Sequence, residues 1–464
     1  MSPVTPWIVL ALGVILVRPQ EFVPFLFGLP VLNLALALAT VVWLFTGGKR
    51  FDTPQMLIVA LLSLVIALSS LVNSGLSGLD HVIKTFFPGV WLFVLIASTA
   101  RSVRDVRVYW EAIALFGLAI VLHTIQVYHF TVGWTGIEVL VENGVKRGIY
   151  VGIFRDPNDL GLFLVSIAPV YIAWWRRSSG LLEFVVHAVL LGLLVYAIYL
   201  TNSRGAMIGL GLVGLLALYK QYGRKIAILG SALLPVLIAL ISVRVTQEFG
   251  SDASSVGRLD SWYAGIQMFF THPVLGVGYD RFVEFNWLTA HNSFILILAE
   301  VGILGYVLWT GLLVANMYGL ARVFGASRCG EANGVEIAPA PGRRNTRSNA
   351  SVTAGVSRRQ SVGDDASTRV SPRVNEQQAQ ALGETAFMAL AGLMVCAFFL
   401  SQSYSIYVFA IQALATAGLG LAIESTSICT QGRCYLAFGK VLLAALASVV
   451  VLIMLVWILI RILN

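Results

Sequence analysis

Long apolar runs alternate with short polar segments along nearly the whole chain. Only helices and closed barrels cross a bilayer, and these runs lack the apolar and polar alternation of barrel strands, so the pattern predicts a helical membrane protein. A transmembrane helix needs roughly 20 apolar residues, and we expect about 12 or 13 spans. They are residues 4–17, 31–46, 55–72, 85–100, 109–128, 158–175, 182–200, 205–219, 226–242, 292–320, 385–401, 406–424 and 437–460.

Composition agrees with this pattern. Hydrophobic residues make up 58% of the chain and charged residues 12%, and the mean hydropathy is +0.83, which excludes a water-soluble globular protein. The first apolar segment has no basic start and no small-residue cleavage site before Arg18, so we interpret it as a retained helix rather than a signal peptide. The predicted fold class is an all-α polytopic membrane protein.

The orientation in the membrane follows from lysine and arginine, which are retained in cytoplasmic loops. Basic residues fall in alternate loops, at Lys49, Arg50, Arg101, Arg104, Arg107, Arg176, Arg177, Lys220, Arg224 and Lys225. These loops are predicted to be cytoplasmic. Residues 323–384 fall on the same side and hold too few large apolar residues to form a core, so we expect a disordered Arg/Ser-rich loop. It separates a transmembrane core, 1–322, from C-terminal helices, 385–464.

The remaining loops face outward in this topology, and they hold polar residues that the charge rule does not explain. The outer loops are 129–157, 201–204 and 243–291. They bring together on one face of the membrane Arg147, Arg155, Arg204, Arg258, Arg281 and His291. Arginine on this side usually needs a carboxylate partner or an anionic ligand. The loops are therefore candidates for the functional site.

The stretch "TNSRGA" at 201–206 joins two spans by a very short turn. Arg204 then lies at the membrane boundary beside a helix amino terminus, where backbone N–H groups and the guanidinium both favour a phosphate, and Ser203 would support this site. An arginine that only anchors the helix end fits this motif equally well.

The other outer motifs have simple local interpretations as well. Asp156 or Asn158 is expected to cap the span after "GIFRDP", which leaves Arg147 and Arg155 without explanation. The stretch "LDSWYAGIQMFF" has helical spacing of apolar residues and predicts an interfacial helix with Arg258 at its start.

The segment "AHNSFILILAE" begins the longest outer-to-inner span. Asn292 or Ser293 is expected to cap this helix. His291 at the same boundary is either an inert hydrogen-bonded side chain or a general base, since neutral imidazole takes up a proton near neutral pH. Glu300 is costly in lipid and is expected to face the bundle, paired with an arginine or accepting a hydrogen bond.

Four motifs together resemble one enzyme superfamily. They are "RGIYVGIFRDPNDLGLFL", "TNSRGA", "GRLDSWYAGIQMFFTHPVLGVGYDRF" and "AHNSFILILAEVGILG". In this order and spacing they are similar to the O-antigen ligases and polymerases of the bacterial envelope. The resemblance implies a class C glycosyltransferase fold that moves a glycan from undecaprenyl pyrophosphate onto an acceptor hydroxyl at the periplasmic face of the inner membrane. It implies that Arg204 and Arg258, with Arg147 and Arg155, hold the pyrophosphate and that His291 acts on the acceptor.

The acceptor is then a lipid A-core sugar for a ligase or a growing glycan for a polymerase, and the motifs leave both open. We expect no cofactor and a metal-independent reaction, because the outer carboxylates form no DxD or His-carboxylate ligand set and arginines can replace the ion. The expected partners are these lipid-linked glycans and membrane lipid, and no nucleic acid. The competing hypotheses are a small-anion transporter, whose site would lie nearer the midplane, and a structural scaffold.

Overall fold

The computed structural model describes residues 1–142, 144–228, 230–231, 253–332, 372–425 and 438–463. Among these residues, nine helices are long and apolar enough to cross a membrane, and the shorter apolar helices α2 and α4 accompany them. The predicted all-α polytopic class is thereby confirmed. The span expected at 226–242 lies mostly outside the described residues, so the total number of spans stays a prediction.

The helices follow the apolar runs closely. The elements of the first half are α1 Thr5–Val17, α2 Val31–Phe45, α3 Pro54–Thr85, α4 Phe87–Thr99, α5 Val103–Phe130, β1 Leu140–Glu142, β2 Val145–Arg147, α6 Pro157–Arg176, α7 Leu181–Leu200 and α8 Arg204–Tyr222. The elements of the second half are α10 Ala253–Thr271, α11 Phe282–Phe285, α12 Ser293–Ala332, α13 Pro372–Ala397, α14 Ile406–Ser425 and α15 Phe438–Leu463. Short 3-10 turns precede α2 and α6.

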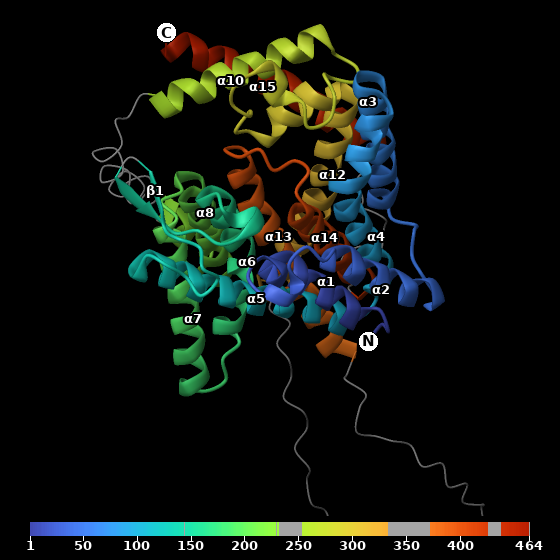
Figure 1. Ribbon diagram of the computed structural model, residues 1–464. Helices are drawn as coiled ribbons and strands as arrows, with labels where there is room; N and C mark the ends of the chain where they lie inside the picture. The colour runs from blue at the N-terminus through green and yellow to red at the C-terminus, as the bar shows by residue number, and fades with distance from the viewer. Residues whose placement is uncertain (143, 229, 232–252, 333–371, 426–437, 464) are drawn as a thin grey trace, which may run out of the picture.

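Helices α13 and α14 lie at the centre of the bundle (Figure 1). Helix α13 packs against α14, α6, α8 and α12, while α14 also packs against α4. Buried amides join three helices near the centre, since Gln55 of α3 donates to Asn316 of α12, which donates to Gln412 of α14. Interhelical hydrogen bonds of this kind hold helices together where apolar burial offers no driving force.

The basic loops gather at one end of this bundle. Arg50, before α3, forms an ion pair with Glu424 at the end of α14, and Lys220 at the end of α8 pairs with Glu384 of α13 at 2.9 Å. The start of α8 and the start of α14 therefore lie at the other end. The described parts of the predicted outer loops are at that second end.

Helix α12 is broken at Gly302, whose φ is +67°. The segment 273–278 supplies the missing backbone hydrogen bonds: Val277 N–H donates to the Ala299 carbonyl at 3.0 Å, and Ile303 N–H donates to the Pro273 carbonyl at 2.8 Å. A Cβ at Gly302 would lie 2.4 Å from a backbone oxygen of this segment, and one at Gly276 would lie 2.2 Å from the Glu300 backbone. Only glycine fits at either position.

Helix α3 holds the same segment from its other side. The Ser69 hydroxyl donates to the Leu275 carbonyl at 2.6 Å, and the Asn73 amide donates to the Gly276 carbonyl at 3.2 Å. Because every polar backbone group at membrane depth needs a partner, the segment 273–278 is fixed between α3 and the first half of α12.

Two features differ from the sequence predictions, and a third agrees with them. The predicted disordered segment 323–384 is too long at both ends, because α12 continues to Ala332 and α13 begins at Pro372, while 333–371 lies outside the described residues. A β hairpin in the loop 129–157 was not predicted. The outer loop 243–291 contains a full helix, α10, as expected for an interfacial element.

Candidate functional site

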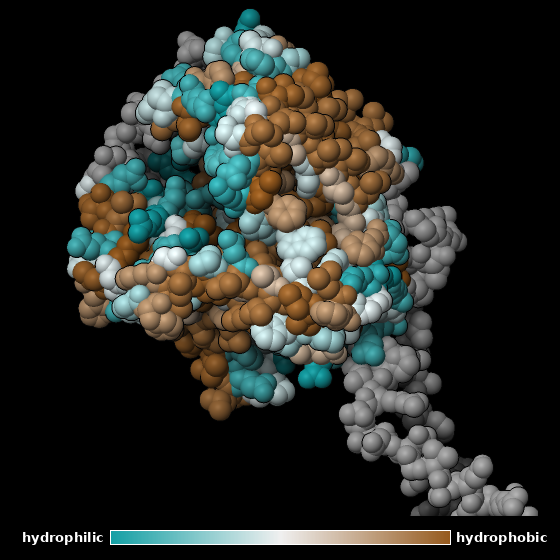
Figure 2. Space-filling model, turned by 45° about the vertical axis from the view of Figure 1, so that its right-hand side comes forward, coloured by the Kyte–Doolittle hydropathy of each residue, from teal (hydrophilic) through white to brown (hydrophobic). Residues whose placement is uncertain are grey.

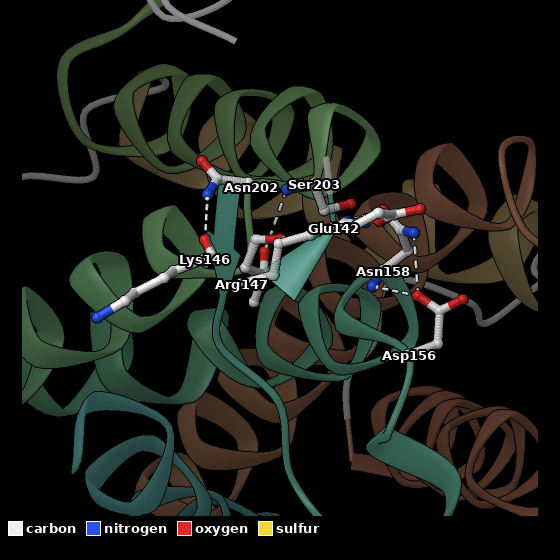
Figure 3. A network of polar contacts seen from close by, with 8 residues as sticks. Glu142, Lys146, Arg147, Asp156, Asn158, Asn202 and Ser203 are labelled. Atoms are coloured by element: carbon white, nitrogen blue, oxygen red, sulfur yellow. Dashed lines mark hydrogen bonds and ion pairs between the residues drawn. The ribbon is translucent and has the colours of Figure 1, made fainter. Parts of the chain in front are cut away.

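The β1–β2 hairpin lies against the turn between α7 and α8 (Figure 3). Gly148 N–H, directly after β2, donates to the Leu200 carbonyl at 2.8 Å. The Asn202 side chain donates to the Lys146 carbonyl at 3.0 Å. Two outer loops that lie far apart in the sequence thus form one surface.

Arg147 joins this surface to α6 with all three of its nitrogens. Its Nε donates to the Thr201 carbonyl at 3.0 Å, one Nη to the Glu142 carboxylate at 2.9 Å and the other Nη to the Asn158 side chain at 3.0 Å. The residue is only 9% exposed. Arg147 therefore holds the hairpin, the turn and the start of α6 together, a contribution that sequence analysis did not foresee.

The start of α6 confirms the predicted capping. The Asp156 carboxylate accepts the Asn158 backbone N–H at 2.7 Å and its side-chain N–H at 2.9 Å, which leaves the Asn158 oxygen for Arg147. Arg155 directly precedes this cap. Its side chain is exposed and forms no hydrogen bond or ion pair with another described residue, so its predicted role stays a prediction.

Arg204 and Arg258 differ from Arg147 in having no hydrogen bond or ion pair with a described residue. Arg204 is the first residue of α8, where Ser203 is the N-cap and accepts Ala206 N–H at 3.4 Å. Arg258 is half-buried in the second turn of α10. Burial lowers the pKa of Arg258, and the nearby cations Arg204 and Arg147 lower it further.

The three guanidinium groups therefore share one region of positive potential. Asp156 and Glu142 oppose it only in part. A helix amino terminus adds partial positive charge at Arg204. Such a group of cations favours a multivalent anion that accepts several hydrogen bonds.

His291 completes this group from the start of α12. It is half-buried, and its φ of +45° is in the left-handed region, which costs energy for a residue with a Cβ. The next residues hold it there: the Asn292 side chain caps α12 by accepting Phe294 N–H at 2.9 Å and Ile295 N–H at 3.1 Å. The cap predicted at Asn292 is confirmed.

The charge state of His291 depends on this setting. Burial lowers its pKa, the Arg258 cation lowers it further, and Asp156 acts in the opposite direction. The neutral imidazole is thus favoured at ordinary pH, and this is the form that accepts a proton. The same interactions indicate that His291, Arg258 and Asp156 lie close together.

Two further residues are placed by the structure. Glu300 is buried in α12 and accepts the Phe282 N–H at 2.9 Å. Of the two roles predicted for it, pairing with an arginine or accepting a hydrogen bond, the structure has the second. His81 was missed by sequence analysis: its Nε2 lies 2.8 Å from the Asp280 carboxylate. The only sequence signal was a polar stretch after the apolar run of α3.

The arrangement fits anionic and proton-transfer chemistry. Hydrophilic residues surround a hollow on one side of the molecule (Figure 2). Among the described residues no three His, Cys, Asp or Glu side chains are grouped to hold a metal ion. The cations and the imidazole offer anion binding and proton transfer at this end of the bundle.

Comparison with known proteins supports the resemblance found in the sequence. Residues 188–310 match the family described as O-antigen ligase, a range that includes Arg204, Arg258 and His291. The chain is 24% identical over 212 residues to the exopolysaccharide production protein ExoQ of Rhizobium meliloti (strain 1021), covering 39% of this chain and 48% of that protein. The chain therefore matches about half the length of this curated relative.

Proposed function

We propose that this chain, which resembles the O-antigen ligase and polymerase superfamily, is a membrane glycosyltransferase that moves a glycan from undecaprenyl pyrophosphate to an acceptor hydroxyl. The observation that carries the proposal is the grouping of His291 with Arg258 and Arg204, two cations without a described partner. A lipid-linked donor supplies the anion for these cations, and its acceptor supplies the proton for the imidazole.

In this reaction the bond between the anomeric carbon and the pyrophosphate oxygen breaks, and the acceptor oxygen forms the new bond. The negative charge that develops on the leaving pyrophosphate is stabilised by Arg204, Arg258 and the amino terminus of α8. His291 takes the proton of the acceptor hydroxyl. Arg147 supports this site by fixing the hairpin and the α7–α8 turn, and Arg155 stands exposed beside it as a further contact for the donor.

The same proposal places the site outside the cytoplasm. The basic loops lie at the end of the bundle opposite the arginine group, which consists of Arg147, Arg204 and Arg258. The charge rule assigns basic loops to the cytoplasm. In a bacterial inner membrane the site then faces the periplasm. A carrier lipid holds its pyrophosphate at headgroup depth, which matches the position of Arg204 at the start of a span.

Two acceptors fit this chemistry, and each has one observation in its favour. The matched family is described as O-antigen ligase, which favours transfer to a lipid A-core sugar. The relative from Rhizobium meliloti is an exopolysaccharide production protein, which favours extension of a growing glycan. Extension of a growing glycan also needs no lipopolysaccharide as acceptor.

Deletion of the gene tests the proposal and separates the acceptors. A polymerase is expected to leave single repeat units without long chains, while a ligase is expected to leave long chains on the carrier lipid. Complementation with the unmodified gene must restore the parent glycan. A deletion strain whose surface glycan and carrier-linked glycan both equal those of the parent contradicts the proposed function.

A further inference from the structure

A cavity of about 220 Å³ lies at the start of α12, and the segment that leads to His291 forms part of its wall. Its walls come from the outer loop, the first half of α12 and the loop between α13 and α14. The residues that matter for its chemistry are Tyr279, Asp280, Thr289, Glu300, Ser401 and Tyr404. Thr289 is two residues before His291, so the cavity adjoins the proposed reaction centre.

Glu300 is the most informative of these residues. It is 2% exposed, and one carboxylate oxygen accepts the Phe282 N–H. The Tyr404 hydroxyl and the Asp280 N–H interact with the carboxyl group, but neither this hydroxyl nor Glu300 Oε2 makes a hydrogen bond of ordinary geometry with a described residue. A buried oxygen and a buried hydroxyl with such poor geometry leave room for a ligand to complete their hydrogen bonds.

The other walls add a matching set of groups. Asp280 stands at the exposed rim, where His81 Nε2 holds its carboxylate at 2.8 Å. The rings of Tyr279 and Tyr404 have centroids 4.6 Å apart at 69°, and Thr85 fixes the Tyr279 hydroxyl at 3.0 Å. Thr289 and Ser401 hydroxyls join each other at 2.9 Å on the remaining wall.

This chemistry selects one class of ligand. The oxygens of two carboxyl groups accept hydrogen bonds and offer a phosphate no cation, so they favour a ligand with several donors. The tyrosine rings offer apolar faces beside these acceptors. A sugar ring has both features, with hydroxyl donors at its edge and C–H groups on its face. The volume is below the roughly 300 Å³ at which sites for drug-sized ligands begin, so it suits one ring rather than a chain.

We propose that the cavity is a saccharide subsite that binds one sugar ring through Glu300, Asp280 and Tyr404. The inference rests on the proposed function and adds the place where one ring of the glycan binds. The ring belongs either to the accepting glycan or to the transferred glycan, which offer the same hydroxyl groups. Because Thr289 of the cavity wall is two residues before His291, either ring is bound close to the new bond.

Glu300→Gln and Tyr404→Phe test the subsite. Glutamine keeps an oxygen for the Phe282 N–H and replaces the second carboxyl oxygen by an NH2 group, while phenylalanine keeps the ring and removes the hydroxyl. Glu284→Gln is the matched control, because Glu284 lies in the same loop, pairs with Arg281 and does not line the cavity. The assay uses the purified full-length protein with lipid-linked repeat units from the parent strain as donor and the parent glycan as acceptor.

Initial rates are measured while each substrate is varied in turn. We expect Glu300→Gln to raise KM for one substrate by about 10- to 100-fold, as when a buried polar group is left without its hydrogen-bond partner, and Tyr404→Phe to raise the same KM by less. A raised acceptor KM assigns the ring to the acceptor, and a raised donor KM assigns it to the transferred glycan. Both results support the subsite.

Unchanged KM for both substrates in both variants overturns the subsite, as does a fall in kcat alone. If Glu300→Gln fails to fold, Tyr404→Phe and Asp280→Asn decide by the same criterion. Failure of the proposed function has a different signature, since the unmodified protein then forms no product from the lipid-linked donor at all.

Discussion

Arg147 and Arg258 are expected to affect the stability of the protein in opposite ways when each is replaced by glutamine. Arg147 donates from all three nitrogens to Thr201, Glu142 and Asn158. Arg258 has no described partner and lies near two other cations that lower its pKa. We therefore predict that Arg147→Gln destabilises the protein, whereas Arg258→Gln leaves its stability unchanged or raises it.

The magnitudes follow from these contacts. A typical hydrogen bond contributes about 0.5–1.5 kcal/mol and one to a charged group about 1.5–3 kcal/mol. Glutamine at 147 keeps at most part of the three bonds, so we expect a loss of about 2–4 kcal/mol in the free energy of unfolding. At 258 glutamine removes repulsion between like charges, which is the usual pattern for groups that serve a ligand rather than the fold.

Activity is expected to show the reverse pattern. Each charged contact to the pyrophosphate that Arg258→Gln removes lowers the rate by about 10- to 150-fold. Arg258→Lys keeps the charge and loses the two-pronged contact, so the transfer rate of this variant is expected to fall by about tenfold or more. Arg204→Lys is expected to behave in the same way. Arg147→Gln loses activity mainly through the fraction of protein that is unfolded, and cooling restores part of it.

The assay combines the thermal unfolding midpoint of purified protein with transfer from a lipid-linked donor. Arg322→Gln is the control, because Arg322 is exposed in α12 and its hydrogen bond goes to Tyr318 in the same helix. Equal destabilisation by Arg147→Gln and Arg258→Gln refutes the distinction between the two residues. Full activity of both Arg204→Lys and Arg258→Lys refutes their role as donor ligands.

Three further substitutions test other parts of the site. His291→Gln is expected to lower transfer by about 10²–10⁴ at an unchanged unfolding midpoint, because the amide cannot take the proton; transfer at the normal rate assigns proton removal to another group. Asp156→Asn keeps the cap but removes the charge that raises the pKa of His291. The acidic limb of the pH–rate profile is therefore expected to move to lower pH. An unchanged limb, or one at higher pH, contradicts this prediction. Gly276→Ala places a Cβ against the Glu300 backbone and is expected to lower the yield of folded protein, whereas Gly214→Ala, with open space around it, is not.

Most of the membrane fold could be predicted from the sequence, because the bilayer makes apolar length decisive. The predicted starts at residues 31 and 406 coincide with those of α2 and α14, and most other ends lie within a few residues. The caps at Asp156 and Asn292 were also predictable, since they depend on neighbours in the sequence. The continuous apolar run of α12 hid its break, because glycine is common in such helices and only the docked segment shows why Gly302 is needed.

The hairpin was missed although its signal was present. Asn143-Gly144 stands between two short runs with strand-forming residues, a strong indication of a two-residue turn. The polar character of the loop concealed it. The contrast between Arg147 and Arg258 had no local signal, because it depends on Thr201, Asn158 and Arg204, which only the folded chain brings together.

The break in α12 has a consequence for engineering. Residues 272–303 form one interlocked unit, because the segment 273–278 supplies hydrogen bonds to the helix that follows it and Ser69 of α3 ties both together. Chimeras that exchange only the polar loop between related enzymes would separate a backbone from its partners. A graft that carries 272–303 as a single cassette, together with a serine at the position of Ser69, keeps them paired and transfers the His291 and Glu300 positions intact.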